Sequence, residues 1–187
     1  MSGDVHVRFC ESVGVKFPGA THLVVLARYQ GSRLTGWIES KLEGWLGLEI
    51  NREKTRVVHL KEEGASLDFL GFTFRYYDDL QGRGWRYLSM SPSGTALKKE
   101  REKRHEMTNH RPCSSPIPQL IEKLNRHLKG WGNYFDLGYP RQAFGEINSY
   151  IRHRLVQHLR RRSQRPFRPP EGVSYYQQIQ RFGLVRL

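Results

Sequence analysis

The residues of this chain best suited to chemistry are arginines, and they crowd a stretch without carboxylates. Positions 152 to 168 contain neither Asp nor Glu. The arginines of this stretch are Arg152, Arg154, Arg160, Arg161, Arg162, Arg165 and Arg168. A guanidinium binds phosphate through two parallel hydrogen bonds and also stacks on bases. Because uncompensated cations repel one another until a polyanion binds, the stretch predicts phosphate contacts rather than a merely solvated face.

The charge of the whole chain is distributed unevenly. The chain has 187 residues and a formal net charge of +13. Residues 1–90 hold 12 Lys and Arg against 11 Asp and Glu, whereas residues 91–187 hold 19 against 7. A basic half indicates an anionic partner, and aromatic residues interleaved with the cations favour nucleic acid over a membrane surface. We therefore expect nucleic-acid contact in residues 91–187 and no membrane partner.

A second basic and aromatic cluster precedes the arginine stretch. It contains Arg126, Lys129, Trp131 and Tyr134. We expect Arg126 and Lys129 to contact the same polyanion. Aromatic residues at helical spacing usually belong to a core, so Trp131 is expected to pack against the following helix. Tyr134 is the best candidate to keep a polar edge at the surface.

Cysteine and histidine spacing predicts no metal site. Cys10 and Cys113 form no CxxC pair, which argues against zinc and against a disulfide scaffold, and favours a reducing compartment. Two pairs of histidines in the basic half are each five positions apart and therefore do not share a helix face. The sequence shows neither a secretion signal nor a run of about 18 apolar residues. We expect a cytoplasmic protein without a cofactor.

Hydrophobic periodicity predicts the elements of the first half. Residues 1–22 have no clear period and are assigned no element. Strands are predicted over residues 23–26, 55–60 and 67–74, and a hairpin over residues 72–88 with its tip at 78–84. A helix is predicted from Ser32 to its end at Gly47. Its apolar stripe comprises Leu34, Ile38, Leu42, Trp45 and Leu46.

The second half is predicted to be helical. Pro92 is expected at an early helical position, with Gly130 and Gly132 permitting a turn or a close helix approach. The predicted segments are a solvated helix over 96–107, a linker over 112–118, amphipathic helices over 120–131 and 144–159, and a short last helix within 173–187. The fold class is therefore α+β, a small antiparallel sheet with one helix followed by an all-helical region.

Two separated motifs resemble one known family. Residues 46–55, Leu-Gly-Leu-Glu-Ile-Asn-Arg-Glu-Lys-Thr, and residues 67–72, Leu-Asp-Phe-Leu-Gly-Phe, resemble the end of the palm of group II intron reverse transcriptases. Residues 129–135, Lys-Gly-Trp-Gly-Asn-Tyr-Phe, and the arginine stretch resemble the thumb and maturase-specific region of the same proteins. Two motifs in the right order make the resemblance specific. It implies an N-terminal lead-in over 1–22, a palm remnant over 23–90 and a thumb and maturase region over 91–187.

The chain departs from this family at the catalytic residues. In the family a Tyr-Ala-Asp-Asp turn enters the strand equivalent to residues 23–28, and its carboxylates hold two Mg²⁺ ions. Thr21 and His22 occupy those positions and cannot replace anionic oxygen ligands. A Tyr-x-Asp-Asp string at residues 76–79 follows a different strand and is expected to be a hairpin tip. We therefore expect no polymerase activity, and Mg²⁺ only if another chain supplies the polymerase half.

The resemblance implies an RNA-binding, maturase-like protein of a mobile element that assists the folding and splicing of structured group II intron RNA. Two alternatives stay open. The chain could be the C-terminal part of a split RNA-directed DNA polymerase, which an upstream reading frame ending in Tyr-Ala-Asp-Asp would favour. It could also be an inactive relic, in which residues 1–20 arise from a shifted frame.

Overall fold

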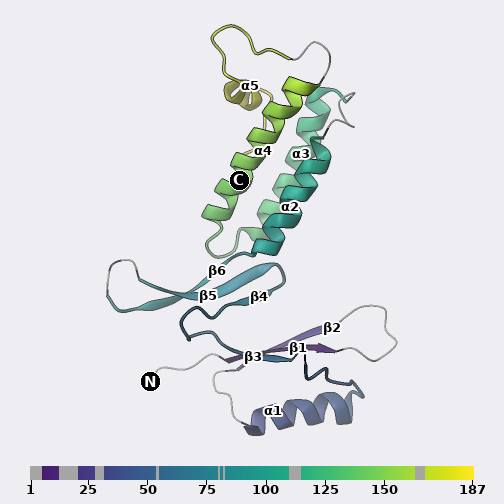
Figure 1. Cartoon of the computed structure of the whole chain (residues 1–187), viewed down its shortest axis with the longest axis vertical. Coiled ribbons are helices and arrows are strands. Elements are labelled where there is room, and N and C mark those ends of the chain that lie inside the picture. The colour runs from purple at the N-terminus through teal and green to yellow at the C-terminus, as the bar shows by residue number, and fades with distance from the viewer. Residues whose placement is uncertain are drawn as a thin grey trace. The chain divides into compact units, whose positions relative to one another are not determined.

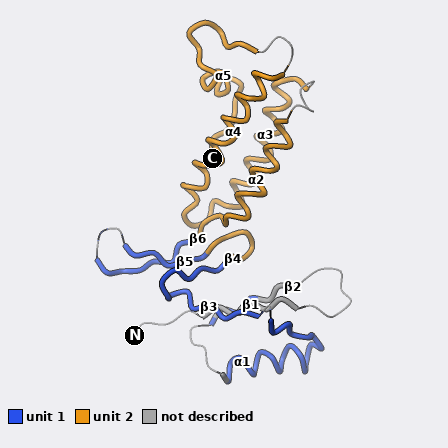
Figure 2. The backbone as a smooth tube through the Cα atoms, in the orientation of Figure 1, with its two compact units in different colours: residues 1–67, 74–89 blue, residues 68–73, 90–187 orange. Residues whose placement is uncertain are grey.

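The chain forms two compact units. The computed structural model describes residues 6–12, 21–27, 32–53, 55–79, 81, 83–109, 115–162 and 167–187. Unit 1 comprises residues 1–67 and 74–89, and unit 2 comprises residues 68–73 and 90–187 (Figure 2). Strands and helices both contribute to the chain, which confirms the predicted α+β class (Figure 1).

Unit 1 contains a three-stranded antiparallel sheet. Strand β1 (His6–Ser12) lies in its centre, between β2 (Thr21–Ala27) and β3 (Arg56–His59). The predicted strands over 23–26 and 55–60 are confirmed as β2 and β3. Strand β1 was not predicted, because residues 1–22 were assigned no element, although Val7 and Phe9 alternate there with polar residues in the period of a strand.

The predicted helix of unit 1 changes its geometry halfway. Helix α1 (Ser32–Glu39) continues as the π-helix η1 (Ser40–Trp45), and Gly47 follows with a φ of 61°. Ile38 is buried as predicted, but Trp45 is 78 % exposed and Leu46 is exposed. A π-helix has more residues per turn than an α-helix, so the last positions of the predicted apolar stripe rotate away from it.

The second sheet has the strand order β4 (Leu67–Phe69), β5 (Phe72–Asp78) and β6 (Arg86–Pro92). The hairpin over 72–88 is confirmed, and the Asp79 amide donates a hydrogen bond of 2.8 Å to the Trp85 carbonyl. The single strand predicted over 67–74 is wrong, because Leu70 and Gly71 have positive φ values of 49° and 82°. They form a tight turn between β4 and β5.

Four helices lie among the described residues of unit 2. They are α2 (Gly94–Met107), α3 (Ile117–Phe135), α4 (Arg141–Arg161) and the short α5 (Tyr175–Arg181). The prediction of Pro92 as a helical residue is wrong, because Pro92 ends β6 and the Ser93 hydroxyl caps α2 by accepting from the Ala96 amide. The predicted linker over 112–118 lies partly outside the described residues, and α3 already begins at Ile117.

Helices α2, α3 and α4 lie side by side and enclose the core of unit 2 (Figure 1). The predicted amphipathic stripes of α3 and α4 are confirmed. Their most deeply buried side chains are Leu124, Leu128, Ile147, Ile151, Leu155 and Leu159. Trp131 packs at 5.7 Å from the ring of Phe144 in α4, as predicted.

The C-terminal segment packs back onto α3 and α4. The Asn125 side chain donates to the Gly183 carbonyl at 2.8 Å and accepts from the Val185 amide at 2.9 Å. A Cβ on Gly132 would lie 2.6 Å from the Leu187 side chain, so this glycine permits the close approach of the C-terminal segment instead of the predicted approach of a helix. A Cβ on Gly130 would meet nothing within 4 Å, and Gly130 is an ordinary residue of α3.

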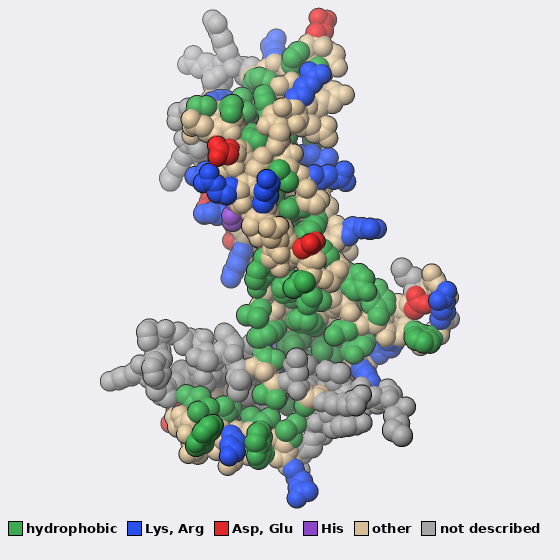
Figure 3. All heavy atoms as spheres, turned by 180° about the vertical axis from the view of Figure 1, so that it is seen from behind, with side chains coloured by type: hydrophobic (Ala, Val, Ile, Leu, Met, Phe, Trp, Pro, Cys, Tyr) green, Lys and Arg blue, Asp and Glu red, His purple; other side chains and the backbone are tan. Residues whose placement is uncertain are grey.

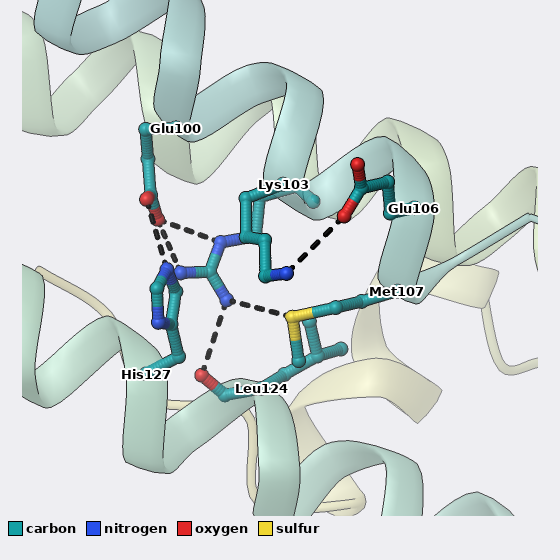
Figure 4. A network of polar contacts seen from close by, with 7 residues as sticks. Glu100, Lys103, Glu106, Met107, Leu124 and His127 are labelled. Atoms are coloured by element: carbon teal, nitrogen blue, oxygen red, sulfur yellow. Dashed lines mark hydrogen bonds and ion pairs between the residues drawn. The ribbon is translucent and has the colours of Figure 1, made fainter.

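Helix α2 was predicted to be solvated, yet it carries a buried ion pair. Arg104 is fully buried, and Glu100 is only 4 % exposed. Two guanidinium nitrogens of Arg104 donate to Glu100 Oε1, with Nε at 2.7 Å (Figure 4). Glu100 Oε2 lies 3.0 Å from His127 Nε2 of α3, and Arg104 Nη1 donates to the Leu124 carbonyl at 3.5 Å. The network therefore joins α2 to α3.

Candidate nucleic-acid interface

The predicted nucleic-acid contacts lie at several places on unit 2. In Figure 3, Lys and Arg side chains project from several positions along the helical part of the chain, with few carboxylates among them. Helix α4 carries four of the ten predicted residues, with Arg162 as its C-cap, and its 3.6-residue turn distributes them around its circumference. The position of each arginine around α4 decides what it contacts.

Arg154 and Arg161 share the flank of α4 that faces the end of α2. With His158 between them, they line a pocket of about 180 Å³. The other lining residues are His105, Thr108, Asn109 and Gln157. None of these seven described residues carries a carboxylate, so the pocket has a positive potential suited to an anion.

Arg154 is fixed at the wall of this pocket by its own hydrogen bonds. Its Nε donates to Thr108 Oγ1 at 3.2 Å, and Nη2 donates to the Thr108 carbonyl at 3.5 Å. Its Nη1 donates to Gln157 Oε1 at 3.1 Å. Thr108 is the C-cap of α2, whose terminal carbonyls lack intrahelical partners. Arg154 therefore holds α4 against the end of α2.

His158 supports the same junction from inside. It is buried, and its Nδ1 lies 3.2 Å from the Thr108 carbonyl, to which it donates. Burial lowers the pKa of His158, and the positive charges of Arg162 and Arg154 lower it further, against the opposing hydrogen bonds to the Thr108 and Asn109 carbonyls. His158 is therefore a neutral residue at pH 7 whose surroundings are already cationic.

Two further arginines of the predicted set bind the backbone of unit 2. Arg152 Nε donates to the Asn148 carbonyl at 3.2 Å. Arg162 Nη2 donates to the Ser115 carbonyl at 2.5 Å, just before α3. Both side chains are half-buried. These contacts give Arg152 and Arg162 a structural function whether or not they also approach a phosphate.

The remaining arginines of the stretch are more accessible. Arg160, Arg161 and Arg168 are exposed. The Arg160 guanidinium lies 5.0 Å from the ring centre of Tyr175 in α5, which places it in a cation–π contact. Arg165 lies outside the described residues. Exposed guanidinium groups can turn towards a phosphate without breaking an internal hydrogen bond.

A wider groove lies between α2 and α3. Its volume is about 1040 Å³. Its basic lining residues are Lys103, Lys123, Arg126 and His127, with Met107, Leu120 and Trp131 among the apolar ones. Arg126 is 79 % exposed in its side chain and pairs with Glu122 at 3.1 Å, while Lys129 is exposed outside the groove lining. Such a surface pair is weak and leaves Arg126 available.

Tyr134 keeps an accessible ring but its hydroxyl has a partner. The side chain is 51 % exposed, and its hydroxyl donates to the Leu70 carbonyl at 2.9 Å. The ring also stacks on Phe72 at 5.7 Å. Tyr134 therefore fixes the β4–β5 turn to α3 within unit 2, and only its exposed ring face remains for stacking on a base.

The Tyr-x-Asp-Asp string at residues 76–79 takes part in no metal-binding group among the described residues. No group of three or more His, Cys, Asp or Glu side chains comes together there as a metal site. Asp78 of the Tyr-x-Asp-Asp string is exposed and pairs with Arg86 at 3.0 Å across the hairpin. Its carboxylate therefore has a local structural role.

Sequence reasoning found the arginines but not the pocket they share. His105, Thr108, Asn109 and Gln157 were not among the predicted site residues, because their proximity to α4 depends on how α2 ends. The signal within α4 was present, since residues 154, 158 and 161 recur at the i, i+4 and i+7 spacing of one helix face. Only the packing of α2 against α4 completes the site.

The fold and the site define a mixed α+β protein with a basic helical unit. The family model of the group II intron maturase-specific domain matches residues 97–172, which include α3, α4 and the small basic pocket. Residues 97–172 are therefore similar to the maturase-specific domain of group II introns, in agreement with the resemblance found in the sequence. The match does not extend over residues 23–90, so their assignment to a palm stays a prediction.

The chain matches none of the curated proteins. No described helix is long and apolar enough to cross a membrane.

Proposed function

We propose that this protein binds structured group II intron RNA and assists its folding and splicing without polymerising nucleotides. The observation that carries this proposal is the coincidence of two features in one segment. The maturase-specific match over residues 97–172 contains all ten of the predicted RNA contacts, in a part of the sequence with few acidic residues. Intron splicing is what a maturase domain serves, and a cationic surface is what an RNA backbone requires.

The mechanism is electrostatic. The exposed arginines Arg126, Arg160, Arg161 and Arg168, with Lys129, neutralise phosphates and release their counterions. Arg152, Arg154 and Arg162 keep the helices at fixed distances through backbone contacts, and Tyr134 offers a ring face to an unpaired base. A-form RNA has a deep, narrow major groove, so recognition depends on the shape of the backbone more than on base edges.

We propose that RNA affinity is concentrated in the thumb and maturase region. Residues 91–187 carry an excess of 12 cations, counted as 19 Lys and Arg against 7 Asp and Glu, and residues 1–90 carry an excess of one, counted as 12 against 11. The palm remnant over 23–90 would then act as a support. Cytoplasmic localisation is part of the same proposal.

A four-residue variant tests this function. Replacing Arg126, Arg160, Arg161 and Arg168 with Gln removes four exposed charges while keeping helix propensity in α3 and α4. We expect weaker binding to intron RNA and a dependence of log K on log salt that is flatter by roughly 0.7 to 0.9 per lost contact. Intron splicing in the presence of the variant should fall in parallel.

The control removes the same charge from unit 1. Its substitutions are Arg33→Gln, Arg52→Gln, Arg56→Gln and Arg83→Gln, all at exposed positions. This control should bind and support splicing like the parent. If both variants weaken RNA binding equally, only net charge matters and the assignment of the interface to unit 2 is wrong. If the parent binds intron RNA no better than an unrelated RNA of equal length, the maturase function itself is refuted.

A further inference from the structure

The small pocket between α2 and α4 has the composition of an anion site. Four of its seven lining residues are basic by type, namely His105, Arg154, His158 and Arg161, and none is acidic. Arg161 and His105 are exposed at its rim, and His158 is buried at its base. Arg154 and Arg161 are permanently charged, and no carboxylate in the lining offsets their mutual repulsion.

Helix ends explain only part of this cluster. Both α2 and α4 end near the pocket, and basic side chains are favourable at helix C-termini. Arg154 and His158 serve this purpose, because both donate to the Thr108 carbonyl at the end of α2. The Arg161 side chain makes no hydrogen bond or ion pair with another described residue. Its positive charge is therefore in excess of what the helix ends require.

Arg154 is arranged to bind a second group. Three of its five N–H donors are engaged by Thr108 and Gln157. The contacts among described residues leave two N–H groups for a ligand, on a guanidinium whose position is already fixed. A preorganised fork loses little side-chain entropy when it binds an oxyanion.

The pocket size selects the ligand. A volume of about 180 Å³ lies below the roughly 300–1,000 Å³ of sites that enclose a small organic molecule. A tetrahedral oxyanion with its bound water fits, whereas a nucleoside does not. Arg154 and Arg161 line the pocket without a carboxylate, so the potential inside it is positive before any ligand arrives.

We propose that this pocket binds one phosphate group of the RNA backbone, held between Arg154 and Arg161. The proposal rests on the proposed function, which supplies the RNA. Free inorganic phosphate has the same chemistry, so the experiment must separate the two sources. The site would fix the register of the RNA on α2 and α4, because the Arg154 guanidinium is held by three hydrogen bonds and cannot follow a displaced phosphate.

Phosphate ethylation tests the proposal on the full chain. Intron RNA ethylated at about one phosphate per molecule is bound to the parent, and the bound and free fractions are compared position by position. The variants are Arg161→Gln, and Arg154→Lys, which keeps the charge but loses the planar fork. The control is Arg181→Gln, an exposed change of equal charge on α5.

In the parent, we expect ethylation of one particular phosphate to block binding strongly. In Arg161→Gln and Arg154→Lys that phosphate should become insensitive while the other positions keep their interference. Arg161→Gln should also flatten the salt dependence of log K by about 0.7 to 0.9, and Arg181→Gln should keep the parental pattern. An interference pattern identical in the parent and in both pocket variants would overturn the proposal.

A separate arm uses inorganic phosphate alone. Side-chain N–H signals of Arg154 and the ring signals of His158 are followed by NMR during titration of the full chain with phosphate. Saturable shifts in the parent that disappear in Arg161→Gln would support the anion site. If the same chain failed to bind intron RNA, that failure would refute the proposed function but not the anion site. Absence of both the interference position and the saturable shifts would refute the anion site, whatever the splicing assay shows.

Discussion

The buried pair of Glu100 and Arg104 predicts a large loss of stability when Arg104 is replaced by Met. Met is similar in length and apolar, so the change removes the charge without leaving a large cavity. The Glu100 carboxylate then stays buried with His127 as its only charged or polar side-chain partner in the network (Figure 4). Breaking a buried pair by removing one member lowers the free energy of unfolding by about 3–5 kcal/mol.

The pH dependence gives this prediction its sign. Burial raises the pKa of the Glu100 carboxyl, while the charge and hydrogen bonds of Arg104 oppose that rise. In the pH window just above the ordinary pKa of a glutamate, the folded protein therefore holds a proton that the unfolded chain has released. Stability from this group is present below that window and falls as pH rises through the folded pKa. Without Arg104, its charge and hydrogen bonds no longer oppose the rise in the pKa of Glu100, so the pH window in which the folded protein holds the extra proton becomes wider.

The assay is urea unfolding of the parent and variants at pH 7 and pH 5. We expect Arg104→Met to lose less free energy of unfolding, relative to the parent, at pH 5 than at pH 7, because protonation of Glu100 neutralises the unpaired charge. Each further unit of pKa shift is equivalent to about 1.4 kcal/mol at pH values above both pKa values. The double variant Glu100→Leu with Arg104→Met should recover most of the loss, since apolar replacement of both partners is often neutral or better.

Lys103 provides the matched control. It is the preceding residue of α2, and its exposed ion pair with Glu106 measures 3.2 Å (Figure 4). Lys103→Met also removes one positive charge, but surface pairs contribute only about 0–1 kcal/mol. If Arg104→Met were no more destabilising than Lys103→Met, or equally destabilising at both pH values, the buried carboxylate would not be the cause.

Three further predictions concern single positions. Gly138→Ala should lower the free energy of unfolding by at least about 1–3 kcal/mol, because its φ is 79° and a Cβ would lie 2.2 Å from a main-chain oxygen. Gly145→Ala is the control, because Gly145 lies inside α4 and its Cβ would meet nothing within 4 Å. It should raise the free energy of unfolding by about 0.5–1 kcal/mol in the same urea titration. Trp131→Ala should lower the free energy of unfolding by about 3–5 kcal/mol and should weaken RNA binding through this loss of stability. Recovery of RNA binding at low temperature would show that the binding defect is indirect. Primer extension with Mg²⁺ should give no template-dependent product, because Thr21 and His22 offer no carboxylate pair; a product that disappears on Asp78→Asn would contradict this.

The sequence predicts those parts of the fold in which one periodicity decides the outcome. Leu120, Leu124 and Leu128 recur at helical spacing, and each is buried in α3. A helix buries a face whose spacing is fixed by its own turn, so no knowledge of its partner is needed. The same holds for α4 and for the hairpin, where a polar tip separates two strand-like runs.

Elements that depend on a distant partner could not be predicted in this way. The positive φ of Leu70 is unfavourable for a residue with a Cβ, so local preference indicates a continuous strand there. Tertiary contact decides otherwise, since the Tyr134 hydroxyl of α3 binds the Leu70 carbonyl and the Phe135 ring lies 3.2 Å from where a Gly71 Cβ would be. Glu100 and Arg104 similarly have the composition of a solvated helix, and only the neighbouring α3 shows that they are buried.

The arginines of residues 152–168 differ in what they already contact within the protein. Of the seven arginines in this stretch, three already donate to protein carbonyl, hydroxyl or amide oxygens, namely Arg152, Arg154 and Arg162. Among the described positions, Arg160, Arg161 and Arg168 are exposed and can give most of their donors to RNA. At about 0.7 to 0.9 per contact, these three account for a salt slope of roughly 2 to 3, whereas seven free arginines would give roughly 5 to 6. A measured slope for this segment near the higher value would mean that RNA binding displaces the internal hydrogen bonds and rearranges the junction of α2 with α4.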